Sequence, residues 1–274
     1  MLDSITKLDA AHAGQVVVAA SHGGAYPGYL AARGGVRAVI LNDAGLGKDD
    51  AGIDALAFLA ALGIPAAAAA HQSARIGDGA DLLASGRLSR INAPAAGAGC
   101  QPGMAVAEAA QRLRVHRPLA SAIGIPTQAE ARHDLVPGAA VPVAGLDSVS
   151  LLAPGDRGAI VVTASHGGVL AQSGSDSVAH PVLAVSFHDA GGGKDDAGYG
   201  RLPLLQARGL AAVTVAGHSA RIGDARSCYV DGVLSRANAC AQALGAREGM
   251  RLKAFIAGLL ARHEHTHQET QEDV

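Results

Sequence analysis

Three short polar motifs, each present twice, carry the side chains of this sequence that could do chemistry. Ser-His-Gly-Gly occupies 21–24 and 165–168, Asp-Ala-Gly-x-Gly-Lys-Asp-Asp-Ala-Gly occupies 43–52 and 189–198, and Ser-Ala-Arg-Ile-Gly-Asp occupies 73–78 and 219–224. Together they supply hydroxyl, imidazole, ammonium, guanidinium and carboxylate groups, which are the groups that hydrolytic sites use. We therefore expect a site built from these motifs.

The Ser-His-Gly-Gly motif places a hydroxyl and an imidazole beside two residues without side chains. Such a segment predicts a general acid or base, or an anion cradle made of backbone N–H groups. A serine and histidine that only cap the following helix are an equal alternative. The candidate catalytic residues are Ser21, His22, Ser165 and His166, and the candidate substrate-binding residues are Gly23, Gly24, Gly167 and Gly168.

The second motif is the densest cluster of charge in the chain. Its lysine is followed by aspartate rather than Ser or Thr, and two adjacent acids would repel phosphate, so it is not a nucleotide-binding loop. A lysine held among carboxylates could serve as a general base, and the acids could instead bind a divalent cation or complete a helix dipole. The candidate catalytic residues are Asp43, Lys48, Asp189 and Lys194, and the residues that precede the motif, Asn42 and His188, are candidate substrate ligands.

The third motif combines a hydroxyl, a guanidinium and a carboxylate within six residues. Arginine clamps carboxylates and carbonyl groups, although an Arg–Asp pair that only locks its loop is a common alternative. Candidate nucleophiles are Ser73 and Ser219, and candidate substrate ligands are Arg75, Asp78, Arg221 and Asp224. For a fourth repeated set we favour helix capping by its Ser and Asn residues; the set comprises Ser89, Arg90, Asn92, Ser235, Arg236 and Asn238.

The repetition extends beyond the motifs, since residues 2–24 resemble residues 146–168 as well. This predicts an internal duplication. The copies also differ, because His71-Gln72 corresponds to Gly217-His218. Such differences favour one composite site near a pseudo-twofold axis, or one working and one structural site, over two identical sites.

Apolar runs typical of strands buried on both faces precede the three motifs in each copy. We expect strands at 15–20, 36–42, 64–70, 159–164, 182–187 and 211–216, and helices at 51–62, at 202–208, and after each Gly-Met pair, ending near Leu113 and His263. The predicted fold class is α/β, with two similar β-α-β-α-β-α halves and a mostly parallel sheet. Polar segments at the carboxyl ends of parallel strands would face one crevice, where ligands bind in such folds.

The domain boundaries follow from the same pattern. A first repeat at 1–113 precedes a proline-containing connector at 114–145, with one short helix expected from Pro126. A second repeat follows at 146–262, and residues 263–274 form a polar tail.

Composition restricts the partners of this 274-residue chain. A formal net charge of -2 and 3% aromatic residues do not favour nucleic acid, and no apolar run is long enough to span a membrane. The N-terminus lacks a secretory pattern, and three unpatterned cysteines indicate no disulfide framework, so we expect a cytoplasmic protein. The many Ala and Gly residues are compatible with close helix packing in a homo-oligomer.

These features predict a cofactor-independent hydrolase of an amide, cyclic amide, imide or ester bond in a small polar, anionic substrate. Lys48 or Lys194, with His22 or His166, would act as base, and glycine-rich backbone would stabilise an oxyanion. One alternative is a metal-assisted hydrolase or lyase that uses His22, Asp43 and His71, with His166, His188 and Asp189. Another is a non-catalytic module that binds an organic anion.

Overall fold

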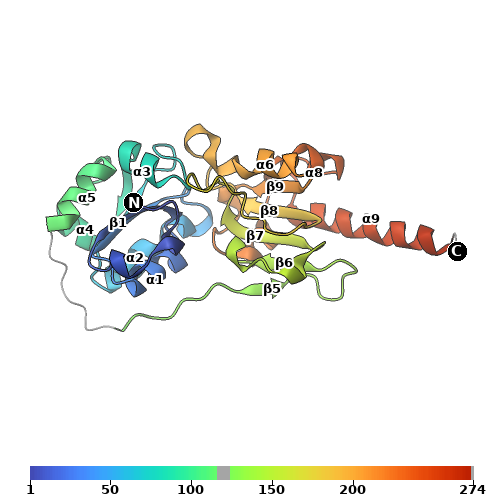
Figure 1. Ribbon diagram of the computed structural model, residues 1–274, viewed down its shortest axis with the longest axis horizontal. Helices are drawn as coiled ribbons and strands as arrows, with labels where there is room; N and C mark the ends of the chain where they lie inside the picture. The colour runs from blue at the N-terminus through green and yellow to red at the C-terminus, as the bar shows by residue number, and fades with distance from the viewer. Residues whose placement is uncertain (116–123, 273–274) are drawn as a thin grey trace. The chain divides into compact units, whose positions relative to one another are not determined.

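The computed structural model describes residues 1–115 and 124–272, with side chains described to residue 264, and shows an α/β protein with two mixed, mostly parallel sheets (Figure 1). The chain divides into two compact units. The first unit comprises 1–129, 168–175 and 190–198, and the second comprises 130–167, 176–189 and 199–274. The second lysine motif, at 190–198, therefore packs within the first unit.

The first unit has a four-stranded sheet in the order β1-β2-β3-β4, in which only β4 is antiparallel to its neighbour. Its strands are β1 (Val16–His22), β2 (Ala38–Asn42), β3 (Ala66–Ala69) and β4 (Leu88–Ile91). The apolar residues of the first three strands are buried on both faces, as expected where helices cover a parallel sheet. The helices are α1 (Ala25–Arg33), α2 (Asp54–Ala61), α3 (Gly79–Ser85), α4 (Ala93–Gly97) and α5 (Val106–Val115).

The second unit has a six-stranded sheet in the order β10-β9-β8-β7-β6-β5, whose two edge strands are antiparallel. Its strands are β5 (Arg132–Asp134), β6 (Val143–Leu146), β7 (Ile160–His166), β8 (Ala184–His188), β9 (Ala211–Val215) and β10 (Leu234–Ala237). Its helices are α6 (Arg201–Ala207), α7 (Ala225–Asp231), α8 (Ala239–Ala243) and α9 (Leu252–Glu272).

All six predicted strands are present, but the β-α-β-α-β-α pattern is incomplete. Residues 167–183, all of which the structure describes, contain no helix between β7 and β8. The edge strands β4, β5 and β10 were not predicted, because they are short and contain polar residues that give no apolar run.

Two predictions outside the sheets were wrong. No helix begins at Pro126: residues 124–131 are irregular and lead into β5, whereas 116–123 lie outside the described residues. The last helix does not end near His263, because α9 continues to Glu272 through residues predicted to be a tail; Figure 1 shows it as the red helix that leads to the C-terminus. Among the described helices, none combines the length and apolar character needed to cross a membrane.

The helix predicted from Ala51 begins only at Asp54, after a 3-10 turn at Lys48–Ile53. Within this turn Asp49 and Asp50 have left-handed backbone, with φ of 56° at each. Asp195 and Asp196 have the same conformation in the turn Lys194–Tyr199. The paired acids therefore precede the helices and do not complete the dipole of a first helical turn.

Candidate functional site

The serines of the Ser-His-Gly-Gly motif anchor backbone. The hydroxyl of Ser21, near the end of β1, accepts a hydrogen bond from the N–H of Ile5 at 2.9 Å. The hydroxyl of Ser165, in β7, accepts one from the N–H of Val149 at 2.9 Å. These contacts hold short 3-10 segments against the strands, a structural role that explains both serines without a nucleophile.

The glycines beside them do not form the predicted anion cradle. The N–H of Gly23 donates to the carbonyl of Asn42 at 2.9 Å, and the N–H of Gly24 donates to Nδ1 of His22 at 3.1 Å. In the turn that follows β7, the N–H of Gly167 donates to the carbonyl of His188 at 2.8 Å. These donors are already used within the chain, and an oxyanion would have to displace their acceptors. Gly168 begins the segment 168–175, which belongs to the first unit. His166 is the last residue of β7 and is buried.

Asn42 and His188, predicted as substrate ligands, are both 0% exposed. Nδ2 of Asn42 donates to the carbonyl of Ala74 at 3.2 Å, and Nε2 of His188 lies 3.1 Å from the carbonyl of Ala220. Burial lowers the pKa of His188, which keeps its ring neutral with the Nε2 proton directed at that carbonyl. Both residues tie a strand end to the third motif rather than face a substrate.

The serines and aspartates of the third motif make hydrogen bonds within the chain. The hydroxyls of Ser73 and Ser219 each donate to a backbone carbonyl at 2.7 Å, and each accepts a backbone N–H, at 2.9 and 3.0 Å respectively. Asp78 and Asp224 cap α3 and α7 through their side chains. Hydroxyls with both their donor and acceptor positions filled are not placed as nucleophiles.

Arg75 and Lys194 lie together in the first unit, in an ion-pair network that we call the acidic cluster: Arg75, Asp78, Asp81, Ser85, Lys194 and Asp195. Nη1 of Arg75 is 2.8 Å from Oδ2 of Asp195, and Nε is 3.3 Å from Oδ2 of Asp78. Nζ of Lys194 donates to Oδ1 of Asp81 at 2.6 Å and to the hydroxyl of Ser85 at 3.1 Å. The cluster contains two cations and three carboxylates.

The acidic cluster disfavours the roles predicted for its cations, which were catalysis for Lys194 and substrate binding for Arg75. The hydrogen bond with Asp195 raises the pKa of Arg75. Burial by itself would raise the pKa of Asp81, but hydrogen bonds from Lys194 and from the backbone of Arg75 outweigh it and lower that pKa. The ammonium of Lys194 is thus bound to a charged carboxylate of the chain rather than held for a substrate. Lys48 opens the 3-10 turn at Lys48–Ile53 and is half-buried. The N–H of Arg221 donates to the hydroxyl of Ser227.

The contact best suited to acid–base chemistry joins Asp43 and His71. Nδ1 of His71 is 2.9 Å from Oδ1 of Asp43, and the same oxygen accepts the N–H of His71 at 2.9 Å and the N–H of Gly45 at 3.0 Å. Asp43 is 3% exposed. Burial by itself would raise the pKa of Asp43, but hydrogen bonds from His71 and Ser89 outweigh it, so the pKa lies below its usual value. Asp43 is therefore an aspartate that orients an imidazole.

Two glycine turns hold this dyad in place. A Cβ added to Gly191 would lie 2.9 Å from Cα of Gly45 and 3.0 Å from Cδ2 of His71, so backbone approaches the ring directly. The N–H of Lys194 donates to the carbonyl of His71 at 2.9 Å. The second lysine motif thus packs against the dyad through backbone, and its lysine side chain reaches the acidic cluster.

The corresponding acid of the second unit has a different neighbour. Oδ1 of Asp189 accepts the N–H of Gly217 at 2.9 Å, the backbone bond that His71 makes with Asp43. Gly217 has no ring, and the histidine that follows it, His218, is exposed. The hydroxyl of Tyr199 is 3.4 Å from Oδ2 of Asp189 instead. The side-chain contact between Asp43 and His71 therefore has no equivalent at Gly217.

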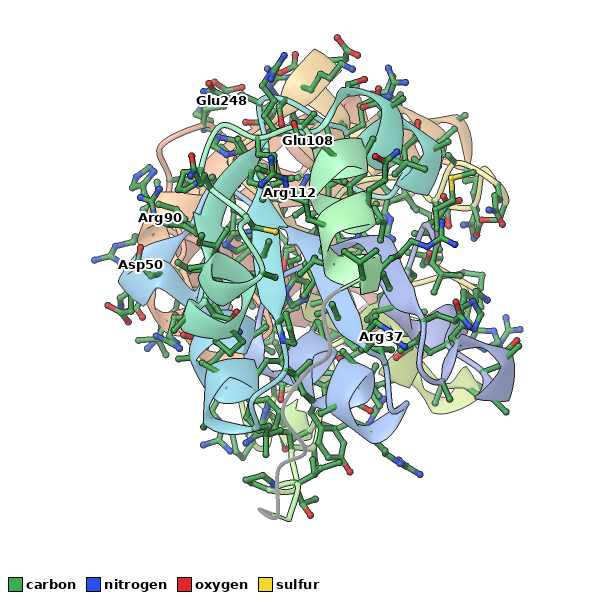
Figure 2. The ribbon with its side chains drawn as sticks, turned by 90° about the vertical axis from the view of Figure 1, so that its left-hand side faces the viewer. Arg37, Asp50, Arg90, Glu108, Arg112 and Glu248 are labelled. Carbon is green, nitrogen blue, oxygen red and sulfur yellow. The ribbon has the colours of Figure 1, made fainter. Side chains whose placement is uncertain are left out.

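In the fourth repeated set, the asparagines cap helices and the serines do not. Asn92 and Asn238 cap α4 and α8, as predicted. Ser89 and Ser235 do not cap helices, since they lie in β4 and β10. Figure 2 shows Arg90, which projects from the surface of the first unit, as does Asp50. Arg236 stacks its guanidinium 3.7 Å from the centre of the Tyr199 ring.

The donor sets predicted for a metal ion are not assembled. Within the described ranges, no three His, Cys, Asp or Glu side chains are grouped as a metal ion would require. Of the predicted ligands, Asp43 and His71 meet, but they bind each other.

No family model matches the chain, and neither curated proteins nor solved structures match it.

Proposed function

We propose that this protein is a hydrolase of an amide, cyclic amide, imide or ester bond in a small polar molecule, with His71 as its general base. The observation that carries the proposal is the 2.9 Å contact between Nδ1 of His71 and the buried carboxylate of Asp43. When Nδ1 donates to a carboxylate, the neutral ring keeps a lone pair at Nε2. The pair of residues thereby holds the tautomer that a base needs.

The reaction follows from this tautomer. Nε2 of His71 takes a proton from water as the water oxygen attacks the substrate carbonyl carbon. The negative charge of Asp43 stabilises the imidazolium that forms, and the imidazolium then protonates the leaving nitrogen or oxygen. The lowered pKa of Asp43 supports this role because the aspartate is ionised throughout the neutral range.

The charge of the neighbouring residues supports a neutral rather than an anionic substrate. Arg75 or Arg221 was expected to hold the anion, but Arg75 binds carboxylates of the chain, and so does the neighbouring Lys194. The acidic cluster has one more carboxylate than it has cations. Because an anion would meet net repulsion there, we infer an uncharged ester, amide or imide.

We also infer that the chain is an internal duplication in which one copy retained the catalytic histidine. Matched hydrogen bonds support this inference. Ser21 and Ser165 accept backbone N–H groups, Ser73 and Ser219 donate to carbonyls, and Asn92 and Asn238 cap helices. The dyad is what the copies do not share, and this favours one working site per chain.

Turnover of a panel of small uncharged esters, amides and cyclic imides tests the proposal. We expect His71→Gln to lower turnover by roughly 100-fold or more, as loss of a positioned general base does. His12→Gln is the matched control, since His12 also pairs with an aspartate, Asp9, at 2.7 Å, but at the surface. Its turnover should equal that of the wild type. Unchanged turnover in His71→Gln would refute the role of this histidine, and saturable binding without turnover would indicate a binding module.

A further inference from the structure

Arg201 is a buried cation that the proposed reaction does not use. It begins α6 in the second unit, is 2% exposed, and its guanidinium carbon lies 4.9 Å from the centre of the Phe187 ring. Its backbone N–H donates to the carbonyl of Gly167 at 2.9 Å. The side chain therefore starts beside the second Ser-His-Gly-Gly turn and packs on the core of its own unit.

Two nitrogens of the guanidinium lack hydrogen-bond acceptors among the described residues. Nε and Nη1 are both buried, and neither has a hydrogen-bond partner within the described part of the chain. These two nitrogens carry three N–H donors. Burial lowers the pKa of Arg201 to about 10, which leaves the group charged at neutral pH. A buried charge with unfilled donors is strongly unfavourable unless an acceptor from outside the chain completes it.

The carboxylate that acts on Arg201 electrostatically, that of Asp176, does not fill its donors. Asp176 attracts the guanidinium electrostatically, but Nη1 of Arg208 is 2.7 Å from one of its oxygens and 2.6 Å from the other. Two guanidinium groups thus share one carboxylate, and the excess charge is positive. Phe187 offers a ring face, which attracts a cation but cannot accept three N–H groups in the way an oxyanion can.

The first unit has no such cation in the matching place. There the residue whose N–H binds the turn glycine is Ala55, which donates to Gly23 at 2.8 Å. Helix α1 packs against it so closely that a Cβ on Gly28 would lie 2.9 Å from Cβ of Ala55. In the second unit no helix follows β7, and the chain carries arginine where the first unit carries alanine.

We propose that Arg201 anchors a binding site for a compact oxyanion, a carboxylate or a phosphate, within the second unit. The oxyanion accepts hydrogen bonds from the guanidinium and balances its charge, and the Phe187 ring lies against the other side of the group. The proposal does not depend on the hydrolytic reaction, because none of the residues that carry it belongs to the Asp43–His71 dyad or to the acidic cluster.

Isothermal titration of the full chain with acetate and, separately, with inorganic phosphate tests the site. Ionic strength is held constant with chloride, so that unspecific screening is the same in every titration. We expect one saturable site per chain, and the tighter of the two anions identifies the oxyanion class. Absence of saturable binding of both anions up to tens of millimolar would overturn the proposal, and would mean that internal water hydrates Arg201.

Variants connect the binding to this arginine. Arg201→Met keeps an unbranched apolar stem, two atoms shorter and without charge, and we expect it to weaken anion binding at least tenfold. Arg201→Lys keeps the charge but loses the planar, paired N–H donors, and it should weaken anion binding by a smaller factor. Arg251→Met, an exposed arginine of the same unit, is the control that leaves affinity unchanged. Unaltered affinity in both Arg201 variants would overturn the assignment, and the lysine variant decides the question if the methionine variant does not fold.

Discussion

Replacing Asp43 with asparagine changes one charge at a carboxylate oxygen that three donors share. The three donors are the N–H of Gly45, the N–H of His71 and Nδ1 of His71, at 2.9–3.0 Å. The asparagine side chain has the same shape, so its oxygen can accept from all three. What the substitution removes is the charge that strengthens these bonds.

The size of the effect follows from this count. A hydrogen bond to a charged group contributes about 1.5–3 kcal/mol, whereas a neutral one contributes about 0.5–1.5 kcal/mol, so three bonds lose roughly 3 kcal/mol in all. Asparagine also avoids the cost of burying a charge, which offsets part of that loss. We expect Asp43→Asn to lower the free energy of unfolding by about 1–2 kcal/mol at pH 7.

The pH dependence has a definite sign. Because the pKa of Asp43 is lower in the folded protein than in the unfolded chain, its ionisation stabilises the fold at every pH above the unfolded value of about 3.9. This contribution is lost as the pH falls through the lower pKa of the folded state. The stability difference between wild type and Asp43→Asn should therefore be constant from roughly pH 5 to pH 8, and should shrink below about pH 4.

Equilibrium urea unfolding, followed by far-ultraviolet circular dichroism across this pH range, measures the difference. Asp134→Asn is the control, because Asp134 is exposed in β5 and its substitution should change stability by less than about 0.5 kcal/mol. Two results would refute the reasoning. One is an Asp43→Asn variant as stable as the wild type at pH 7, and the other is a difference that persists undiminished at the lowest pH at which both proteins stay folded.

Three further substitutions, the first with a matched control, test other parts of the structure by the same unfolding measurement. Gly23→Ala places a Cβ 2.6 Å from the carbonyl oxygen of Gly52 and should lower the free energy of unfolding by more than about 2 kcal/mol. In the control Gly97→Ala the added Cβ meets nothing within 4 Å, so this change should be neutral or stabilising. Equal effects of the two substitutions would contradict the close approach at Gly23. Asn92→Ala removes four hydrogen bonds to backbone, and should cost about 3 kcal/mol; a loss below about 1 kcal/mol would contradict its capping role. Burial raises the pKa of Glu130 to about 7, so its ionisation destabilises the fold as the pH rises from about 4.5 through 7. Glu130→Gln should stabilise the protein by about 1–2 kcal/mol at pH 8, after allowance for solvent screening, and by nothing near pH 4.5, and an equal effect at both pH values would exclude this titration.

The sequence by itself determined the α/β class and the central strands. Runs such as Val16–Ala20 and Ile160–Ala164 contain only residues that suit strands buried on both faces, and local composition is sufficient to predict these. The capping role of Asn92 and Asn238 was also readable, because a cap depends on residues that are neighbours in the chain. The edge strand β4 could not be predicted in this way, because it forms by pairing with β3, which is distant in the sequence.

Only the tertiary structure decided which polar side chains meet. Asp43 and His71 are 28 residues apart, and they become neighbours because β2 and β3 pair in parallel with Asn42 opposite Ala69. The sequence did indicate that Asp43 and His71 each follow the end of a buried strand. It did not indicate that they meet, because strand order and register cannot be predicted from composition. Lys194 and Asp81 are 113 residues apart, so their ion pair depends on how the 190–198 turn packs in the first unit. The repeated motifs supplied candidate chemical groups, and packing determined which of them bind the chain itself. A hydrogen bond depends on atoms being within about 3 Å of each other and not on their order in the sequence.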